Sequence, residues 1–169
     1  MGRIKNRLLA RALTRFPKLL DRLVDKTPRY EADGVPWTPF AMPLKEAKIA
    51  IVTTAGVHLK GQLPFDMKDP AGDPSYRELP ADTPMDEYAI THDYYDHTDA
   101  GRDINIVFPI ERLKELEADG VIGSVAATNY GFMGHIEGAH LDTLVNRTAP
   151  EVAGKIRSEG VDAVILTPG

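Results

Sequence analysis

Short apolar runs alternate with amphipathic segments along the second half of this chain. Four runs are rich in β-branched residues and too short for helices, which predicts strands. These are residues 48–55, 104–108, 121–128 and 161–167. Helices are predicted between or beside them at residues 109–119, 137–147 and 148–160. This alternation predicts an α/β fold with a layered, mainly parallel sheet of the Rossmann-like or flavodoxin-like open type.

Local signals set the expected ends of these elements. Gly160 opens the last run and Pro168 closes it, and the lack of polar alternation predicts a buried parallel strand. Pro109 suits the first turn of a helix that ends at Gly120. Thr148–Glu151 (TAPE) matches a capping box, which predicts that a separate helix starts there and ends at Gly160.

The N-terminus carries a basic amphipathic pattern. Between residues 3 and 26, Lys or Arg recurs every three or four positions beside leucines, which predicts a helix that Pro17 kinks or divides. Such a helix packs on its own acidic domain, docks a partner subunit, or contacts lipid or RNA. We expect residues 1–30 to form this helix and residues 31–169 to form a single α/β domain.

Residues 56–103 show little periodicity. Five prolines interrupt this polar stretch, and within it only residues 88–91 predict a short strand. A long segment without regular structure is uncommon in a compact domain unless it forms a lid or a binding loop. We therefore expect a functional loop in this part of the chain.

Charge and cysteine content narrow the function classes. The formal net charge is −5, but residues 1–27 carry eight Lys or Arg and two Asp, which leaves −11 on the rest. An acidic body argues against a nucleic-acid partner. The chain has no cysteine, which excludes disulfides and Cys-ligated zinc within it and fits a cytoplasmic location. No run approaches 18 apolar residues, so we expect no membrane span.

The densest polar cluster is Thr91–Asp99 (THDYYDHTD). Its imidazoles and carboxylates suit a metal site, an acid/base pair in a catalytic loop, or a hydrogen-bonded structural turn. His92 and His97 are five positions apart, which places them on one face of neither a helix nor a strand. A shared ion would therefore need a looped backbone, and we expect no metal here.

Residues 129–136 form a glycine-rich loop after the predicted strand 121–128. In open α/β sheets, ligands bind beyond the carboxyl ends of the strands. Tyr130 and His135 would offer hydrogen-bonding groups there, while Gly131 and Gly134 permit unusual backbone angles. The alternative is a tight surface loop without a chemical role.

Longer segments carry a further signal. They are VTTAGVHLKGQ (residues 52–62), THDYYDHTD (91–99), RDINIVFP (102–109), YGFMG (130–134) and the final strand with its flanks (160–168). In this order, over about residues 36–169, they resemble the glycine/sarcosine/betaine/D-proline reductase family, specifically its selenoprotein B type subunits.

The resemblance implies a reducing residue at the end of the final strand. In the family, a strand ending in Leu-Thr-Pro-x is followed by selenocysteine or cysteine, so the catalytic residue is expected immediately after Gly169. Because selenocysteine is encoded by UGA, we expect this chain to be an inactive fragment that ends at a recoded codon and lacks the C-terminal part of its domain. The implied reaction is reductive cleavage of a C–N bond in an amino acid or amine.

The resemblance also implies partners. These are a thiol or thioredoxin-type reductant, a partner subunit that can carry a pyruvoyl group, and an oligomeric assembly. Selenocysteine is expected in the full-length protein, and no cofactor is expected in this chain as given.

Candidate pocket residues follow when the family's loops are placed on this sequence. They are Thr54, Gly56, His58, His92, Asp93, His97, Tyr130 and His135. Two other functions remain open at this point. One is a non-catalytic α/β binding or scaffold subunit, and the other is a metal-dependent hydrolase built on the loop from His92 to Asp99.

Overall fold

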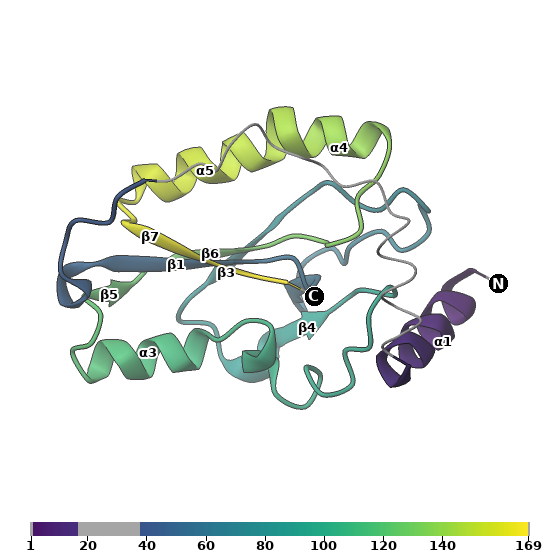
Figure 1. Ribbon diagram of the computed structural model, residues 1–169, viewed down its shortest axis with the longest axis horizontal. Coiled ribbons are helices and arrows are strands. Elements are labelled where there is room, and N and C mark those ends of the chain that lie inside the picture. Colours follow the sequence, from purple (N-terminus) through teal and green to yellow (C-terminus); the bar gives the residue numbers. More distant parts are fainter. Residues whose placement is uncertain (1, 17–37, 169) are drawn as a thin grey trace.

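The computed structural model describes residues 2–16 and 38–168. A central sheet lies between α3 (Ile110–Ala118) on one face and α5 (Ala149–Ser158) on the other (Figure 1). The other helical segments are α1 (Gly2–Arg15), α4 (Ala139–Thr143), the π-helical η4 (Leu144–Thr148), and the 3-10 turns η1 (Leu44–Glu46), η2 (Met85–Glu87) and η3 (Ile104–Ile106). The predicted α/β class and N-terminal helix are therefore confirmed.

Within residues 2–16 and 38–168, seven strands build two sheets. They are β1 (Lys48–Thr53), β2 (Val57–Leu59), β3 (Arg77–Pro80), β4 (Tyr88–Ile90), β5 (Ser124–Val125), β6 (Thr128–Gly131) and β7 (Ala163–Thr167). Strand β1 is central and pairs in parallel with β5, β6 and β7. Strand β3 is antiparallel to β6, and β2 forms a separate antiparallel pair with β4. The larger sheet is thus mainly parallel, as predicted.

Strands β5 and β6 lie along the same side of β1. The carbonyls of Ala47, Ile49 and Thr53 accept hydrogen bonds from the backbone of the segment 124–132. Lys48 and Thr54, which alternate with them, bond instead to β7 and its flank. Because neighbouring residues of a strand direct their backbone groups to opposite sides, β5 and β6 are one interrupted strand.

The prediction of a single strand at residues 121–128 is therefore wrong in its bounds, because the strand is interrupted and extends to Gly131. At the interruption, the Asn129 side chain accepts a hydrogen bond from Ile51 N at 2.7 Å, and its amide donates to Ala126 O. Ala127 N turns away and donates to the Glu159 carboxylate at 2.5 Å. The side chain of Asn129 thus replaces a backbone carbonyl of the ladder, and β6 continues into the predicted glycine-rich loop.

The strand predicted at residues 104–108 is also wrong, because this segment forms the 3-10 turn η3. The Asp103 carboxylate accepts a hydrogen bond from Asn105 N at 3.0 Å, and Phe108 N donates to Ile104 O. A side chain that caps the local backbone competes with a sheet ladder. Asp103 therefore favours the turn despite the apolar, β-branched sequence that follows it.

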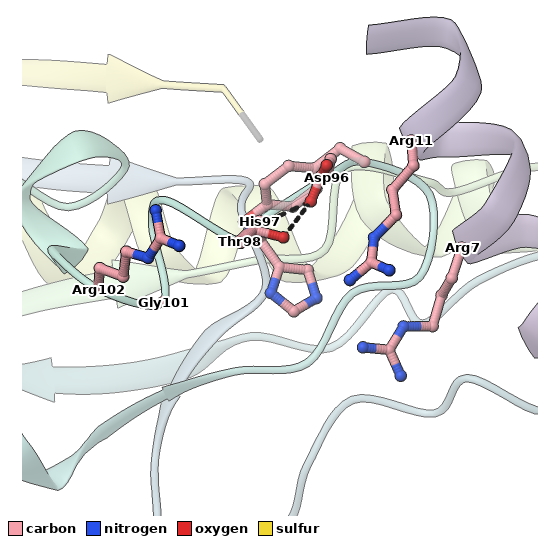
Figure 2. Close-up of a pocket in the computed structure, with 8 residues that line it drawn as sticks. Arg7, Arg11, Asp96, His97, Thr98, Gly101 and Arg102 are labelled. Carbon is pink, nitrogen blue, oxygen red and sulfur yellow. Dashed lines mark hydrogen bonds between the residues drawn. The ribbon is translucent and has the colours of Figure 1, made fainter. Parts of the chain in front are cut away.

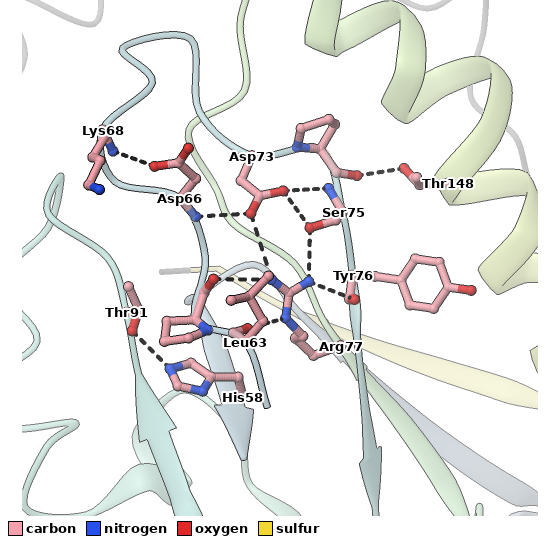
Figure 3. Close-up of polar contacts among 12 residues, drawn as sticks. His58, Leu63, Asp66, Lys68, Asp73, Ser75, Tyr76, Arg77, Thr91 and Thr148 are labelled. Carbon is pink, nitrogen blue, oxygen red and sulfur yellow. Dashed lines mark hydrogen bonds and ion pairs between the residues drawn. The ribbon is translucent and has the colours of Figure 1, made fainter. Parts of the chain in front are cut away.

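Thr148–Glu151 does not form the predicted capping box. Thr148 has helical dihedral angles (φ −72°, ψ −37°), so η4 runs into α5 without a break. Its hydroxyl donates to Pro74 O at 2.8 Å rather than capping a helix (Figure 3). This contact joins the helix to the polar segment 56–103.

The segment 56–103 holds more structure than its sequence suggests. The short strand predicted at 88–91 is confirmed as β4, whereas β2 and β3 were not predicted. Both of these strands pair with distant partners, β4 and β6 respectively. Such long-range pairing leaves no local periodicity by which a sequence would reveal it.

The two faces of the sheet carry separate apolar clusters. Under α3, Phe108 and Leu113 pack with Ile51, and under α5, Val152 packs with Phe132. The last strand is parallel as predicted but is not buried, because β7 pairs only with β1 among the described strands. Val164 and Leu166 on its α5 side are 39% and 75% exposed, so β7 is an open edge.

Helix α1 ends at Arg15, in agreement with the expected break near Pro17. The rest of the predicted basic helix, from residue 17 onward, lies outside the described residues. In α1, Ala10 is buried, whereas Ile4 and Leu8 are 71% and 62% exposed. Among the helices of residues 2–16 and 38–168, none is long and apolar enough to cross a membrane.

Candidate active site

The carboxyl ends of β1, β6 and β7 meet at one edge of the sheet. Thr54 N donates to Thr167 O at 2.9 Å, and the Thr167 hydroxyl donates to Val107 O at 2.7 Å. Gly134 lies so close that a Cβ on it would be 3.1 Å from Thr54 O and 3.4 Å from His92 Nε2. This edge is where open α/β sheets bind ligands.

His92 is buried at this edge with a side chain that faces two backbone amides. Tyr94 N lies 3.1 Å from its Nδ1, and Gly134 N lies 3.3 Å from its Nε2. Burial lowers the pKa of His92 to about 4, and repulsion from His135 and His97 adds to the effect. Because a protonated imidazole accepts no hydrogen bond, His92 is neutral near pH 7.

Aromatic rings surround His92. The Tyr95 ring meets it edge-on with 4.8 Å between centroids, and Tyr94 stacks on His135 at 3.8 Å. The Tyr95 hydroxyl donates to Ala55 O at 3.0 Å, and burial raises its pKa. The structure thus brings His92, His135 and the end of β1 into one cluster.

Gly56 and His58 both contact Thr91, Gly56 through its backbone and His58 through its ring. Gly56 has a φ of +73°, and its carbonyl accepts a hydrogen bond from Thr91 N. His58 Nδ1 lies 2.8 Å from Leu59 O, so it carries the proton, and Nε2 accepts from the Thr91 hydroxyl at 2.8 Å (Figure 3). Both ring nitrogens of His58 are therefore bonded, Nδ1 within β2 and Nε2 to Thr91 directly after β4.

The other predicted site residues are dispersed. Asp93 is buried beside His92 in the chain. Tyr130 is buried in the cluster under α5, with its ring 6.0 Å from that of Tyr76. His97 lies farther along the loop, with its ring 5.5 Å from that of Tyr95. Thr54 and His92 are the predicted side chains with contacts at the shared edge.

The predictions missed the cluster around Asp73 and Arg77 (Figure 3). The Arg77 guanidinium donates to Leu63 O at 2.7 Å and to Tyr76 O at 2.9 Å, and it lies 4.4 Å over the Phe65 ring. Burial acts to raise the pKa of Asp73, but hydrogen bonds from Ser75 and the chain outweigh it and lower the pKa. This cluster fixes the loop before β3 to the sheet.

Replacing Arg77 with lysine is expected to lower the free energy of unfolding by about 2 kcal/mol, since an ammonium group cannot reproduce the planar set of donors. Urea denaturation followed by circular dichroism measures the change. The control is Arg112→Lys on α3, where the guanidinium pairs with the exposed Glu115 at 2.7 Å. That change should alter stability by less than about 0.5 kcal/mol. Equal losses would contradict the bracing role of Arg77.

A pocket of about 250 Å³ lies between α1 and the loop that follows Tyr95 (Figure 2). Its charged lining comes from Arg7, Arg11, His97, Arg102 and Asp96. The sequence predictions identified His97 but not the arginines. The every-fourth-residue spacing of Arg7 and Arg11 was visible, but it does not reveal which surface α1 contacts.

The part of the chain that the structure describes holds no assembled set of metal ligands. Within residues 2–16 and 38–168, no group of three or more His, Cys, Asp or Glu side chains is placed to hold an ion. In the loop from His92 to Asp99, the rings of His92 and His97 both contact the ring of Tyr95.

The sequence matches the family described as glycine/sarcosine/betaine reductase selenoprotein B over residues 24–169. The D-proline reductase subunit gamma of Acetoanaerobium sticklandii is 41% identical over 133 residues, which cover 79% of this chain and 53% of that protein. The glycine reductase complex component B subunit gamma of Carboxydothermus hydrogenoformans is 32% identical over 141 residues, covering 80% of this chain and 31% of that protein. The chain thus spans about half the length of the first relative and less than a third of the second. No solved structure matches it.

Proposed function

The chain belongs to the glycine/sarcosine/betaine reductase selenoprotein B family, and on this premise we propose that it is part of a selenol- or thiol-dependent reductase subunit. The proposed reaction is reductive cleavage of a C–N bond in an amino acid or amine. The observation that supports it best is the shared edge, where the ends of β1, β6 and β7 lie around His92 and Gly134.

The reducing group belongs, in this proposal, directly after Gly169 and therefore next to the end of β7. A selenol or thiol there would supply the nucleophile. The two electrons that C–N cleavage consumes would leave it oxidised as a selenenyl sulfide or disulfide, which the thiol or thioredoxin-type reductant would reduce again. Thr54 and Thr167 tie the ends of β1 and β7 together, so they would hold the start of the following loop in place. The close approach of Gly134 leaves room for backbone rather than for a side chain.

His92 acts as a positioning residue in this proposal. Its low pKa makes it a poor proton donor near pH 7, since burial keeps the ring neutral. A neutral ring accepts at one nitrogen only, and acceptance from Gly134 N by Nε2 would place the loop after β6 against the loop after β4. His92 would thus shape the pocket, while its neighbours exclude water.

The partners are proposed from the relatives. Their names describe subunits of D-proline, glycine, sarcosine and betaine reductases. We propose a small amino acid or amine as substrate, a thiol or thioredoxin-type reductant, a pyruvoyl-carrying partner subunit, and an oligomeric assembly in the cytoplasm. The scaffold and metal-hydrolase alternatives have no specific observation in their favour.

The test is the identity of the residue after Gly169 in the natural gene product. We expect the reading frame to continue through a TGA or cysteine codon, and the purified protein to show the mass of a longer chain. Elemental analysis should find selenium in the TGA case. A codon for any other residue, or a product without selenium and without a thiol at this position, would contradict the redox proposal. The family membership would then fit a binding subunit instead.

A further inference from the structure

The pocket between α1 and the loop that follows Tyr95 carries an excess of positive charge. Figure 2 shows the guanidinium groups of Arg7 and Arg11 extending from α1 toward the His97 imidazole. Arg102 lies on the loop and pairs with Asp99 at 2.9 Å. Three guanidinium groups thus line one small pocket.

Arg7 and Arg11 lie close together without a salt bridge to any carboxylate of the described residues. They are four residues apart on α1, where like charges repel. Among residues 2–16 and 38–168, no carboxylate forms an ion pair with either of them. An anion in the pocket would relieve this repulsion.

The carboxylate of Asp96 offsets only part of this positive charge. It accepts hydrogen bonds from the Thr98 hydroxyl at 2.6 Å and from Thr98 N at 3.1 Å. These bonds lower the pKa of Asp96, with a smaller contribution from the charge of Arg11. Because Asp96 brings one negative charge to a lining with three guanidinium groups, the pocket keeps an excess of positive charge for a second carboxylate.

We propose that this pocket binds the carboxylate of a small amino acid through Arg7 and Arg11. A carboxylate matches the planar, two-pronged donor geometry of a guanidinium. The volume of about 250 Å³ lies below the roughly 300–1,000 Å³ typical of drug-sized ligands, which favours a small molecule. The proposal rests on the proposed function, because it assigns α1 to recognition of the substrate.

A short chain of contacts links the pocket to the candidate active site. Tyr95 lines the pocket, and its hydroxyl donates to Ala55 O just beyond the end of β1. The same ring packs edge-on against His92, which in turn faces Gly134 N. A ligand held by α1 would therefore lie beside the loops that form the shared edge.

The experiment measures binding to the 169-residue chain by NMR titration, with D-proline as the probe and D-prolinamide as the control ligand. D-proline should shift the amide signals of residues 95–102, and D-prolinamide, which has no carboxylate, should bind at least about tenfold more weakly. Arg11→Gln should weaken D-proline binding by about tenfold or more. Lys5→Gln removes the same charge from α1 outside the pocket and should change the dissociation constant by less than about twofold.

Three outcomes would overturn the proposal. They are equal affinity for D-proline and D-prolinamide, equal effects of Arg11→Gln and Lys5→Gln, and tighter binding of inorganic phosphate than of D-proline at the same residues. Circular dichroism shows whether each variant keeps the fold. Because binding needs no turnover, a failure here leaves the reductase proposal in place. The absence of selenium and of a thiol after Gly169 would leave the binding result in place.

Discussion

Replacing Gly56 with alanine is expected to lower the free energy of unfolding by about 3 kcal/mol, as the sum of backbone strain and a steric clash. The φ of Gly56 is +73°, which a residue with a Cβ adopts only with strain. A Cβ here would also lie 2.4 Å from Thr91 O, and this oxygen belongs to backbone that cannot rotate away. Urea denaturation of the two proteins gives the difference.

Gly160 provides a matched control for this substitution. It has the same φ of +73°, but a Cβ there would meet no atom within 4 Å. Gly160→Ala should therefore show only the conformational penalty, about 1 kcal/mol. If both variants lost the same stability, Thr91 would not lie behind Gly56, and the contact between the loops after β1 and β4 would be wrong.

Lowering the pH is expected to destabilise the protein through His92. The pKa of His92 is about 4 in the folded chain, below the ordinary value of 6.5, because the ring is buried. Between these values the unfolded chain binds a proton that the folded chain excludes. The contribution is thus fully present above pH 6.5 and is lost as the pH falls toward 4, at up to about 1.4 kcal/mol per pH unit.

The measurement is the free energy of unfolding between pH 7.5 and pH 4.5 for the wild type and for His92→Gln. The variant has no titrating ring, so its stability should fall less steeply, while the wild type should lose roughly 2–3 kcal/mol more over this range. His140→Gln is the control, since His140 lies near the surface, 2.9 Å from Asp69. If stability fell equally with pH in the wild type and in His92→Gln, His92 would bind its proton as readily in the folded chain as in the unfolded chain. That result would contradict the effect of burial on its pKa.

The sequence predicted elements whose determinants are local. The runs that became β1 and β7 are apolar and bounded by glycine or proline, so these strands were predicted together with their parallel pairing. Helix α3 begins beside Pro109 and was predicted as well. The failures share another cause. Asp103 caps a turn and Asn129 substitutes for a backbone carbonyl, and both effects depend on a side chain whose partner is set by the folded chain.

The candidate site was likewise predictable where its determinants are local to the sequence. The rule that ligands bind at the carboxyl ends of strands placed Thr54 and His135 near one edge, and the contacts of Thr54 and His92 agree with it. Tyr130 also follows a predicted strand, yet strand alternation directs its ring under α5. Arg7 and Arg11 could not be placed, because charge spacing on a helix does not specify the surface that it contacts.

The position of α1 makes the arginine-lined pocket sensitive to ionic strength. One wall of the pocket comes from this helix, whose Ile4 and Leu8 remain largely exposed. The screening length falls from about 8 Å at 0.15 M salt to about 3 Å at 1 M. Concentrated salt would thus weaken the attraction between Arg11 and Asp96 and, at the same time, the attraction of the arginines for a carboxylate ligand. Binding of the proposed carboxylate ligand to α1 is therefore best measured in buffers of low ionic strength.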